Sequence, residues 1–127
     1  MTSIKVANLK HTNKGVRCDR GTALGNPFEL THESERDNVI FGFKRYLWMV
    51  LHHNIEPYIA ANDIANDQNL KISRTWKRPS RDDIESLLTE IIGLYEKENV
   101  TLLCWCFPKK CHCDVIKAYI EWLVSQS

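Results

Sequence analysis

The sequence lacks any apolar run that approaches the ~18 residues of a membrane-spanning helix, and its first residues lack the apolar core of a signal peptide. It also lacks an excess of charge, since 17 basic and 16 acidic residues leave a formal net charge of +1. No general attraction to nucleic acid or to an anionic membrane is therefore expected. Internal repeats, low-complexity segments and domain linkers are missing as well. We expect a cytoplasmic protein that folds as a single domain over residues 1–127.

The composition is that of an ordinary globular protein, with 43% hydrophobic and 26% charged residues. A chain of 127 residues can bury a substantial core without help from a metal ion or a disulfide. The five cysteines, an odd number with four of them clustered, do not suit a secreted disulfide framework. Reduced thiols, a metal site or a functional thiol explain them better.

Apolar residues with a period of two predict two early strands, near residues 4–8 and 16–18, which we expect to be adjacent in the sheet. Residues 100–105 are almost continuously apolar, which is typical of a central strand covered on both faces. Helical segments alternate with these strands. We therefore expect an α/β fold, a small three-layer sandwich with a short, mainly parallel sheet and about three to four helices.

Helical periodicity predicts helices that begin at Ser34, at Pro57, at Ser80 and near Cys111 or His112. Ser34 and Ser80 are expected to act as N-caps, because a serine hydroxyl accepts a hydrogen bond from the free amides of a first turn. The first helix should run to about His52 or His53. Residues 62–69 are rich in Asn, Asp and Gln and are predicted to form a loop.

The residues that suggest chemistry follow two of the predicted strands. In an open α/β sheet, ligands bind where the carboxyl ends of parallel strands meet. The turn from Cys104 to Cys111 and the loop from Arg20 to Phe28 would then face each other across a cleft. Gly21 allows close approach of the backbone to a ligand, and Arg20 can bind phosphate or carboxylate, although this loop matches no phosphate-loop pattern and a solvated surface turn is the alternative.

The cysteine cluster has three interpretations that the sequence leaves open. The thiols can be structural, with Cys104 buried in a strand and Cys111 as a helix cap. They can bind zinc through Cys104, Cys106, Cys111 and His112, although the spacing differs from two separated C-x-x-C pairs. They can also line a ligand pocket. In that case Cys111, at a helix N-terminus, is the candidate reactive thiolate and His112 the candidate proton donor, with Asp114 as an acceptor for a ligand hydroxyl.

Three segments together, residues 20–28, 36–39 and 103–112, resemble the family called domain of unknown function 4326, which occurs in bacteria and is frequent in bacteriophages. The resemblance spans roughly residues 16–123. It implies that one motif set is formed by Arg20, Asn26, Pro27, Phe28, Arg36, Asp37, Cys104, Cys106, Pro108, Cys111 and His112. It is compatible with a phage origin and assigns no catalytic residue.

Together these observations favour a cleft that binds a small molecule, namely a nucleotide or an ADP-ribose-like phosphorylated nucleoside. Arg20 and Arg36 would bind its anionic part, and Phe28 or Trp105 would pack on a ring. The full set of expected ligand-binding residues is Arg20, Gly21, Asn26, Pro27, Phe28, Arg36, Cys104, Trp105, Cys106, Cys111, His112 and Asp114.

In a phage, such a protein could sequester or process a nucleotide signal in the host cytoplasm. The alternatives are a nucleotide-modifying enzyme that uses Cys111 and His112, and a zinc-stabilised module that binds a protein partner. No cofactor is predicted apart from the zinc alternative, and a homo-oligomer is compatible with each hypothesis.

Overall fold

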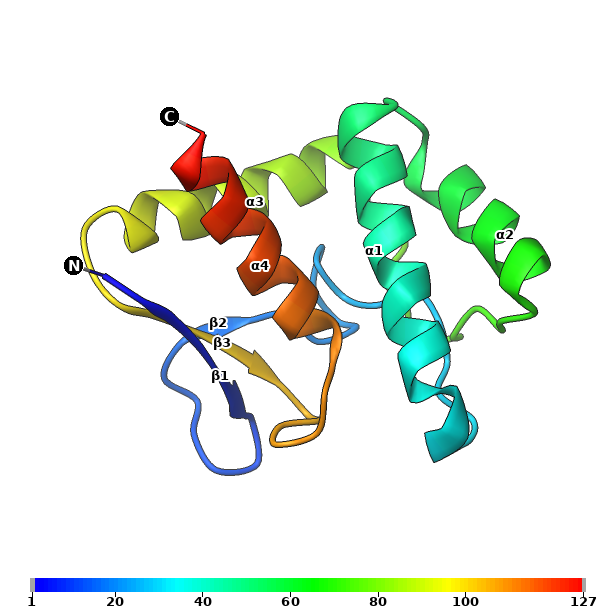
Figure 1. The fold of residues 1–127 in the computed structure, drawn as a ribbon, viewed down its shortest axis with the longest axis horizontal. Helices are drawn as coiled ribbons and strands as arrows, with labels where there is room; N and C mark the ends of the chain where they lie inside the picture. Colours follow the sequence, from blue (N-terminus) through cyan, green and yellow to red (C-terminus); the bar gives the residue numbers. More distant parts are fainter. Residues whose placement is uncertain (1, 127) are drawn as a thin grey trace.

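A three-stranded parallel sheet organises the fold in the computed structural model, which describes residues 2–126 (Figure 1). Its strands are β1 (Ile4–Asn8), β2 (Val16–Arg17) and β3 (Val100–Cys104), and their order in the sheet is β1-β3-β2. The parallel sheet and the central position of β3 are as predicted.

The expectation that the two early strands are adjacent is wrong, because β3 lies between them. The most apolar strand, β3, is central and pairs with a neighbour on each edge. Ile4 of β1 lies opposite Val100, and Val16 of β2 lies opposite Leu102. The connection at residues 9–15 spans the ~10 Å between the outer strands. Gly15 in this connection approaches the backbone of β3, since a Cβ on it would lie 2.5 Å from the carbonyl oxygen of Thr101.

The helices of the described chain are α1 (Arg36–His52), α2 (Pro57–Gln68), α3 (Arg81–Tyr95) and α4 (His112–Ser125), and a 3-10 turn, η1 (Glu33–Glu35), precedes α1. Helix α3 and helix α4 pack against the sheet, whereas α1 packs on α4 and α2 packs on α1. None of the helices within residues 2–126 is both long and apolar enough to cross a membrane.

Two predicted boundaries are wrong. Ser34 does not cap α1, because it lies inside η1 and Glu35 holds the N-cap position. Residues 62–68 are not a loop, since α2 continues to Gln68. Its polar residues face outward, while Ala61 and Ile64 are fully buried. The packing of this apolar side outweighs the loop-like composition.

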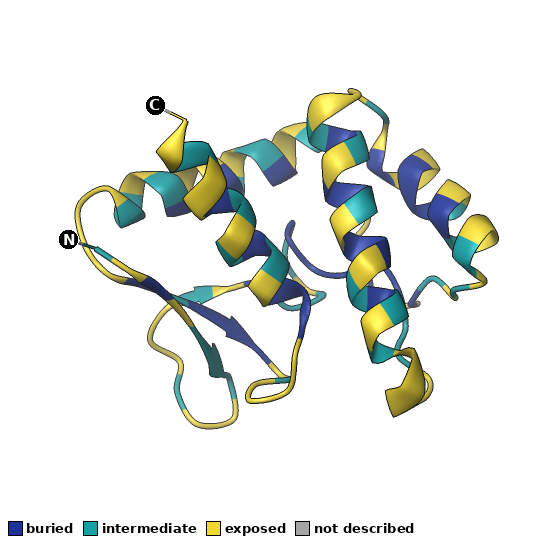
Figure 2. Cartoon of the chain, viewed as in Figure 1, coloured by how far each residue is buried: buried dark blue, intermediate teal, exposed yellow. Residues whose placement is uncertain are grey.

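All four helices, together with β1 and β3, contribute residues to the core, and Figure 2 shows β3 as an almost continuous buried segment. Helix α1 contributes several of the largest buried side chains, among them Phe43 and Tyr46. Trp76, from the basic segment that precedes α3, is only 4% exposed and packs edge-on against Tyr46. The tryptophan therefore anchors its loop to the core.

The capping box at the start of α3 yields a test of the fold. The Ser80 hydroxyl accepts a hydrogen bond from the Asp83 amide at 3.1 Å, and the Asp83 carboxylate accepts one from the Ser80 amide at 3.2 Å. Ser80→Ala should therefore lower the free energy of unfolding by about 1 kcal/mol in urea denaturation. The control Ser86→Ala, at an exposed position inside the same helix, should leave stability unchanged or slightly higher. Equal losses for both variants would contradict the capping role.

Candidate functional site

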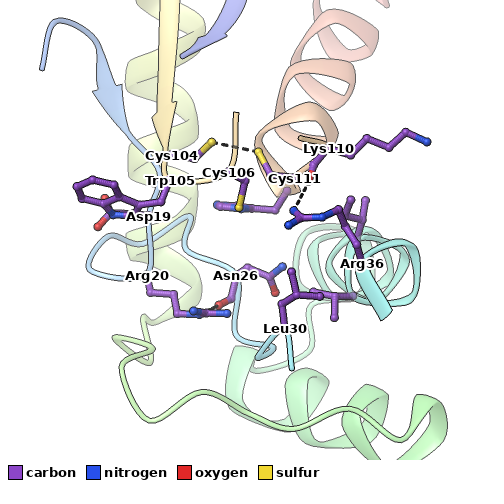
Figure 3. A pocket seen from close by; sticks show the side chains of 13 residues that line it. Asp19, Arg20, Asn26, Leu30, Arg36, Cys104, Trp105, Cys106, Lys110 and Cys111 are labelled. Atoms are coloured by element: carbon purple, nitrogen blue, oxygen red, sulfur yellow. Dashed lines mark hydrogen bonds between the residues drawn. The ribbon is translucent and has the colours of Figure 1, made fainter. Parts of the chain in front are cut away.

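A small pocket lies where β2 and β3 end, at the carboxyl edge of the sheet (Figure 3). Its volume is about 110 Å³. The loop after β2, the loop from β3 to α4 and the first turns of α1 supply its walls. The lining residues are Asp19, Arg20, Asn26, Leu30, Arg36, Val39, Ile40, Cys104, Trp105, Cys106, Lys110, Cys111 and His112. The early arginine-bearing loop and the late cysteine-rich loop therefore form two walls of one cavity.

Most of the residues that the sequence suggested for ligand binding line this pocket, namely Arg20, Asn26, Arg36, Cys104, Trp105, Cys106, Cys111 and His112. Gly21, Pro27, Phe28 and Asp114 do not. The expectation that Phe28 packs on a ligand ring is wrong, because Phe28 is 0% exposed and its ring packs edge-on against Tyr46 in the core. Trp105, by contrast, is 60% exposed at the rim.

Arg20 holds its own loop in shape. Its Nε donates to the carbonyl oxygen of Asn26 at 3.1 Å, and its Nη2 donates to that of Phe28 at 2.6 Å. The guanidinium is partly desolvated, which lowers the pKa of Arg20. Within residues 2–126 no hydrogen bond is formed by Nη1, so one end of this cation is free to meet a ligand.

Arg36, at the start of α1, links η1 to the loop between β3 and α4. Its Nε and Nη2 donate to the two carboxylate oxygens of Glu33 at 2.9 and 2.8 Å, and its Nη1 donates to the carbonyl oxygen of Lys110 at 2.7 Å (Figure 3). The hydrogen bonds from Arg36 lower the pKa of Glu33 to about 2. Each of the three nitrogens of Arg36 therefore already donates within the protein, which leaves two of its five N–H groups for other partners.

The thiols of Cys104, Cys111 and Cys113 form a buried group that could hold a metal ion. Their Sγ atoms all lie within 4.8 Å of one another, and the Sγ atoms of Cys104 and Cys111 are 3.2 Å apart. Cys104 ends β3, while Cys111 is the N-cap of α4 and Cys113 lies in its first turn. The repeated C-x-C spacing at 104–106 and 111–113 was the available sequence signal for Cys113.

The group differs from the zinc ligands expected from the sequence, since neither His112 nor Cys106 belongs to it. The His112 ring is buried, packs edge-on against Phe43 and forms a hydrogen bond through Nε2 with the carbonyl oxygen of Cys18. Burial lowers the pKa of His112 and favours the neutral imidazole. This side chain therefore stabilises the packing of α4 next to the β2 end.

Among the thiols that line the pocket, Cys106 is half-buried whereas Cys111 is only 3% exposed. A hydrogen bond from the Cys111 thiol, assisted by the Arg36 guanidinium, lowers the pKa of Cys106 to about 6. Donation to Cys104 and Cys106 raises the pKa of Cys111. Cys106 is thus more accessible and more readily ionised than Cys111, the thiol that the sequence favoured as reactive.

Sequence reasoning missed five lining residues, namely Asp19, Leu30, Val39, Ile40 and Lys110. The sequence position of Asp19 could have predicted its place in the pocket, because it closely follows the end of a strand, where ligand-binding residues collect. It pairs with the exposed Arg17 at 2.8 Å. Lys110 is exposed, and no ion pair of its ammonium group is found among residues 2–126.

A second, larger hollow of about 560 Å³ lies between α1 and α4. It is lined by Lys44, Leu47, Trp48, Asp114, Val115, Ala118, Tyr119 and Trp122. Asp114 is found here rather than in the thiol-lined pocket, and its carboxylate accepts a hydrogen bond from the Cys111 amide at 3.0 Å. Its role is therefore to cap α4, instead of the expected contact with a ligand hydroxyl.

The fold and the site define a small α/β protein with a thiol-lined pocket at the carboxyl edge of a parallel sheet. The chain belongs to the family described as Domain of unknown function (DUF4326), whose profile matches residues 3–122. The family assignment expected from the sequence is thereby confirmed. No match to the chain was found among curated proteins or among solved structures.

The turn at Gly25 yields a test of how the pocket wall is built. A Cβ at this position would lie 2.5 Å from the Cα of Arg20 and 2.7 Å from the carbonyl oxygen of Asp19. Because both contacts are with backbone, Gly25→Ala should lower the free energy of unfolding by roughly 2 kcal/mol, measured in urea.

Gly93→Ala is the matched control. No atom lies within 4 Å of a Cβ at Gly93, which is exposed inside α3. The same substitution should there raise the free energy of unfolding by up to about 1 kcal/mol, because alanine favours a helix. If Gly25→Ala were tolerated as well as the control, the close packing of the loop would be disproved.

Proposed function

We propose that the thiol-lined pocket binds a phosphorylated nucleoside, such as a nucleotide or an ADP-ribose-like compound. The observation that carries the proposal is the convergence of cationic and aromatic groups on one cavity. Arg20 and Lys110 are among its lining residues, although the exposed Lys110 side chain extends outward and would have to turn toward a ligand (Figure 3). Trp105 is exposed at the rim. The N-terminus of α4 also ends at the pocket. Its capping box engages the Cys111 and Asp114 amides, and the His112 and Cys113 amides of the first turn would favour an anion.

The volume of the pocket limits which part of such a ligand it can enclose. Pockets that surround a whole drug-sized ligand measure roughly 300–1,000 Å³. At about 110 Å³ this pocket has room for one group of phosphate size. The remainder of the ligand would lie across the open rim, where the Trp105 ring offers a stacking surface. The proposed orientation is therefore phosphate inward and base outward.

Binding without turnover is the simpler form of this proposal. The expected pair of Cys111 as nucleophile and His112 as proton donor is weakened by the burial of both side chains. A role in which a phage protein sequesters a nucleotide signal needs only the pocket and its affinity.

The proposal can be tested with a thermal shift screen of nucleotides and ADP-ribose derivatives. AMP should raise the melting temperature, and adenosine, which lacks the phosphate, should raise it less. Lys110→Ala should weaken AMP binding roughly fivefold in calorimetry, equivalent to about 1 kcal/mol. The control Lys97→Ala removes an exposed lysine beyond the end of α3 and should leave the affinity unchanged. Failure of every nucleotide and ADP-ribose derivative to stabilise the protein would refute the proposal.

The three buried thiols favour a second candidate function, a zinc-stabilised module. A zinc ion held by Cys104, Cys111 and Cys113 would link the end of β3 to the start of α4. Such a link would stabilise the cysteine-rich wall of the pocket, because metal binding to the folded state contributes to the free energy of folding.

This candidate is checked by metal analysis of protein purified without chelators. Mass spectrometry under native conditions should find about one zinc ion per chain, and its removal by a chelator should lower the melting temperature. Folded protein that contains no metal and takes up no zinc from a buffered solution would exclude the zinc module while leaving the nucleotide proposal intact.

A further inference from the structure

We infer that a metal ion held by Cys104, Cys111 and Cys113 has its fourth coordination position open to the pocket, where an oxygen atom of the ligand's phosphate would bind. The inference rests on the proposed function for the identity of the ligand, and on the geometry of the thiols for the metal. The inferred site binds its ligand through the metal ion. It differs in this from a structural zinc site, in which protein side chains fill all four coordination positions.

The spacing of the sulfur atoms suits a tetrahedral ion. Zinc–thiolate bonds of about 2.3 Å place neighbouring sulfurs roughly 3.8 Å apart in a tetrahedron. The observed separations are compatible with this value, since one pair lies at 3.2 Å and all pairs lie within 4.8 Å. All three cysteines are buried and none forms a disulfide, so their thiols are available to an ion held between them.

The nearby side chains that could serve as a fourth protein ligand to the ion make other contacts. His112 directs its Nε2 to the carbonyl oxygen of Cys18. The Cys18 thiol lies 3.7 Å from the carbonyl oxygen of Val16 and is outside the three-thiol group. The Asp114 carboxylate binds the Cys111 amide. The Cys106 thiol interacts with the Cys111 thiol but also lies outside the three-thiol group. Within residues 2–126 that group therefore has three members, which leaves one tetrahedral position that an external donor, in place of Cys106, would take.

The position of the pocket indicates where that donor enters. Cys104 and Cys111 line the pocket, whereas Cys113 does not. The cavity therefore adjoins the thiol group on the side of Cys104 and Cys111, with Cys113 behind them. A donor that reaches the ion through the cavity would approach opposite Cys113.

The charges around the pocket suit an anionic donor. Three thiolates around a divalent cation carry a net charge of −1, after the thiols release their protons to solvent. The cations of Arg20 and Lys110 line the same cavity and offset this charge. A phosphate oxygen could then bind the ion while its remaining oxygens meet Arg20 Nη1 and Lys110. Without the ligand, water would fill the position.

The test uses the full chain loaded with cobalt(II) in oxygen-free buffer, because the visible d–d bands of cobalt report its ligands. Azide is small enough to enter the cavity, so it tests the open coordination position even if the protein has no affinity for nucleotides. We expect azide to shift the d–d bands and AMP to reverse that shift by competition. X-ray absorption of the zinc form should show a shell of three sulfurs and one oxygen or nitrogen.

Cysteine-to-serine variants identify which sulfur atoms bind the metal ion. Cys113→Ser, which changes a ligand outside the pocket, should abolish stoichiometric cobalt binding. Cys18→Ser and Cys106→Ser should each retain the metal and the same sulfur count. The absorption experiment on the unaltered protein decides the sulfur count even if Cys113→Ser fails to fold.

The outcomes separate the two proposals. Absence of metal binding, four sulfurs in the shell, or d–d bands that do not respond to azide would overturn the open site. A response to azide that AMP does not reverse would support the open metal site and count against the nucleotide as its ligand.

Discussion

The pairing of β3 with a parallel strand on each edge fixes the position of everything else in the site. Because all three strands run in one direction, their carboxyl ends meet at one edge of the sheet. The Cys18 amide donates to the carbonyl oxygen of Leu103 at 2.9 Å and continues the β2 pairing by one residue. The chain after β2 thus leaves the sheet beside Cys104, although 86 positions separate Cys18 from Cys104 in the sequence. Two distant loops become the walls of one cavity.

The loop between β3 and α4 is held in place mainly by hydrogen bonds from side chains to backbone. From β1, the Asn8 side chain donates to the carbonyl oxygens of Trp105 and Phe107 at 3.1 and 2.8 Å. On the side of α1, Arg36 donates to the carbonyl oxygen of Lys110. Asp114 accepts from the Cys111 amide. Several motif residues that suggest ligand binding in the sequence therefore work on the protein's own backbone, which pre-organises the pocket.

Cys104 and Cys111 belong both to the buried thiol group and to the lining of the pocket. A metal ion held by the thiols would therefore lie next to the cavity. A single buried cysteine is ordinary core packing. Three thiols within 4.8 Å of one another, beside a cavity with cationic walls, offer soft ligands to a metal and a route by which a ligand could reach it. The larger aromatic hollow between α1 and α4 carries one lysine and one aspartate and no thiol, so its size alone does not make it the better candidate.

The sequence by itself determined the α/β class, the central strand, the cap at Ser80 and the two segments in which the pocket residues lie, because these depend on local periodicity and composition. Tertiary structure decided the rest. The placement of β3 between the early strands depends on which strand can pair on both edges. The burial of Phe28 depends on the position of Tyr46, and the partners of Arg20 and Arg36 are carbonyl groups that only the folded chain brings within reach. Tertiary structure also decided that Cys113, and not the expected His112 and Cys106, belongs to the thiol group. The packing of α4 on the sheet sets the directions of the side chains at the start of this helix.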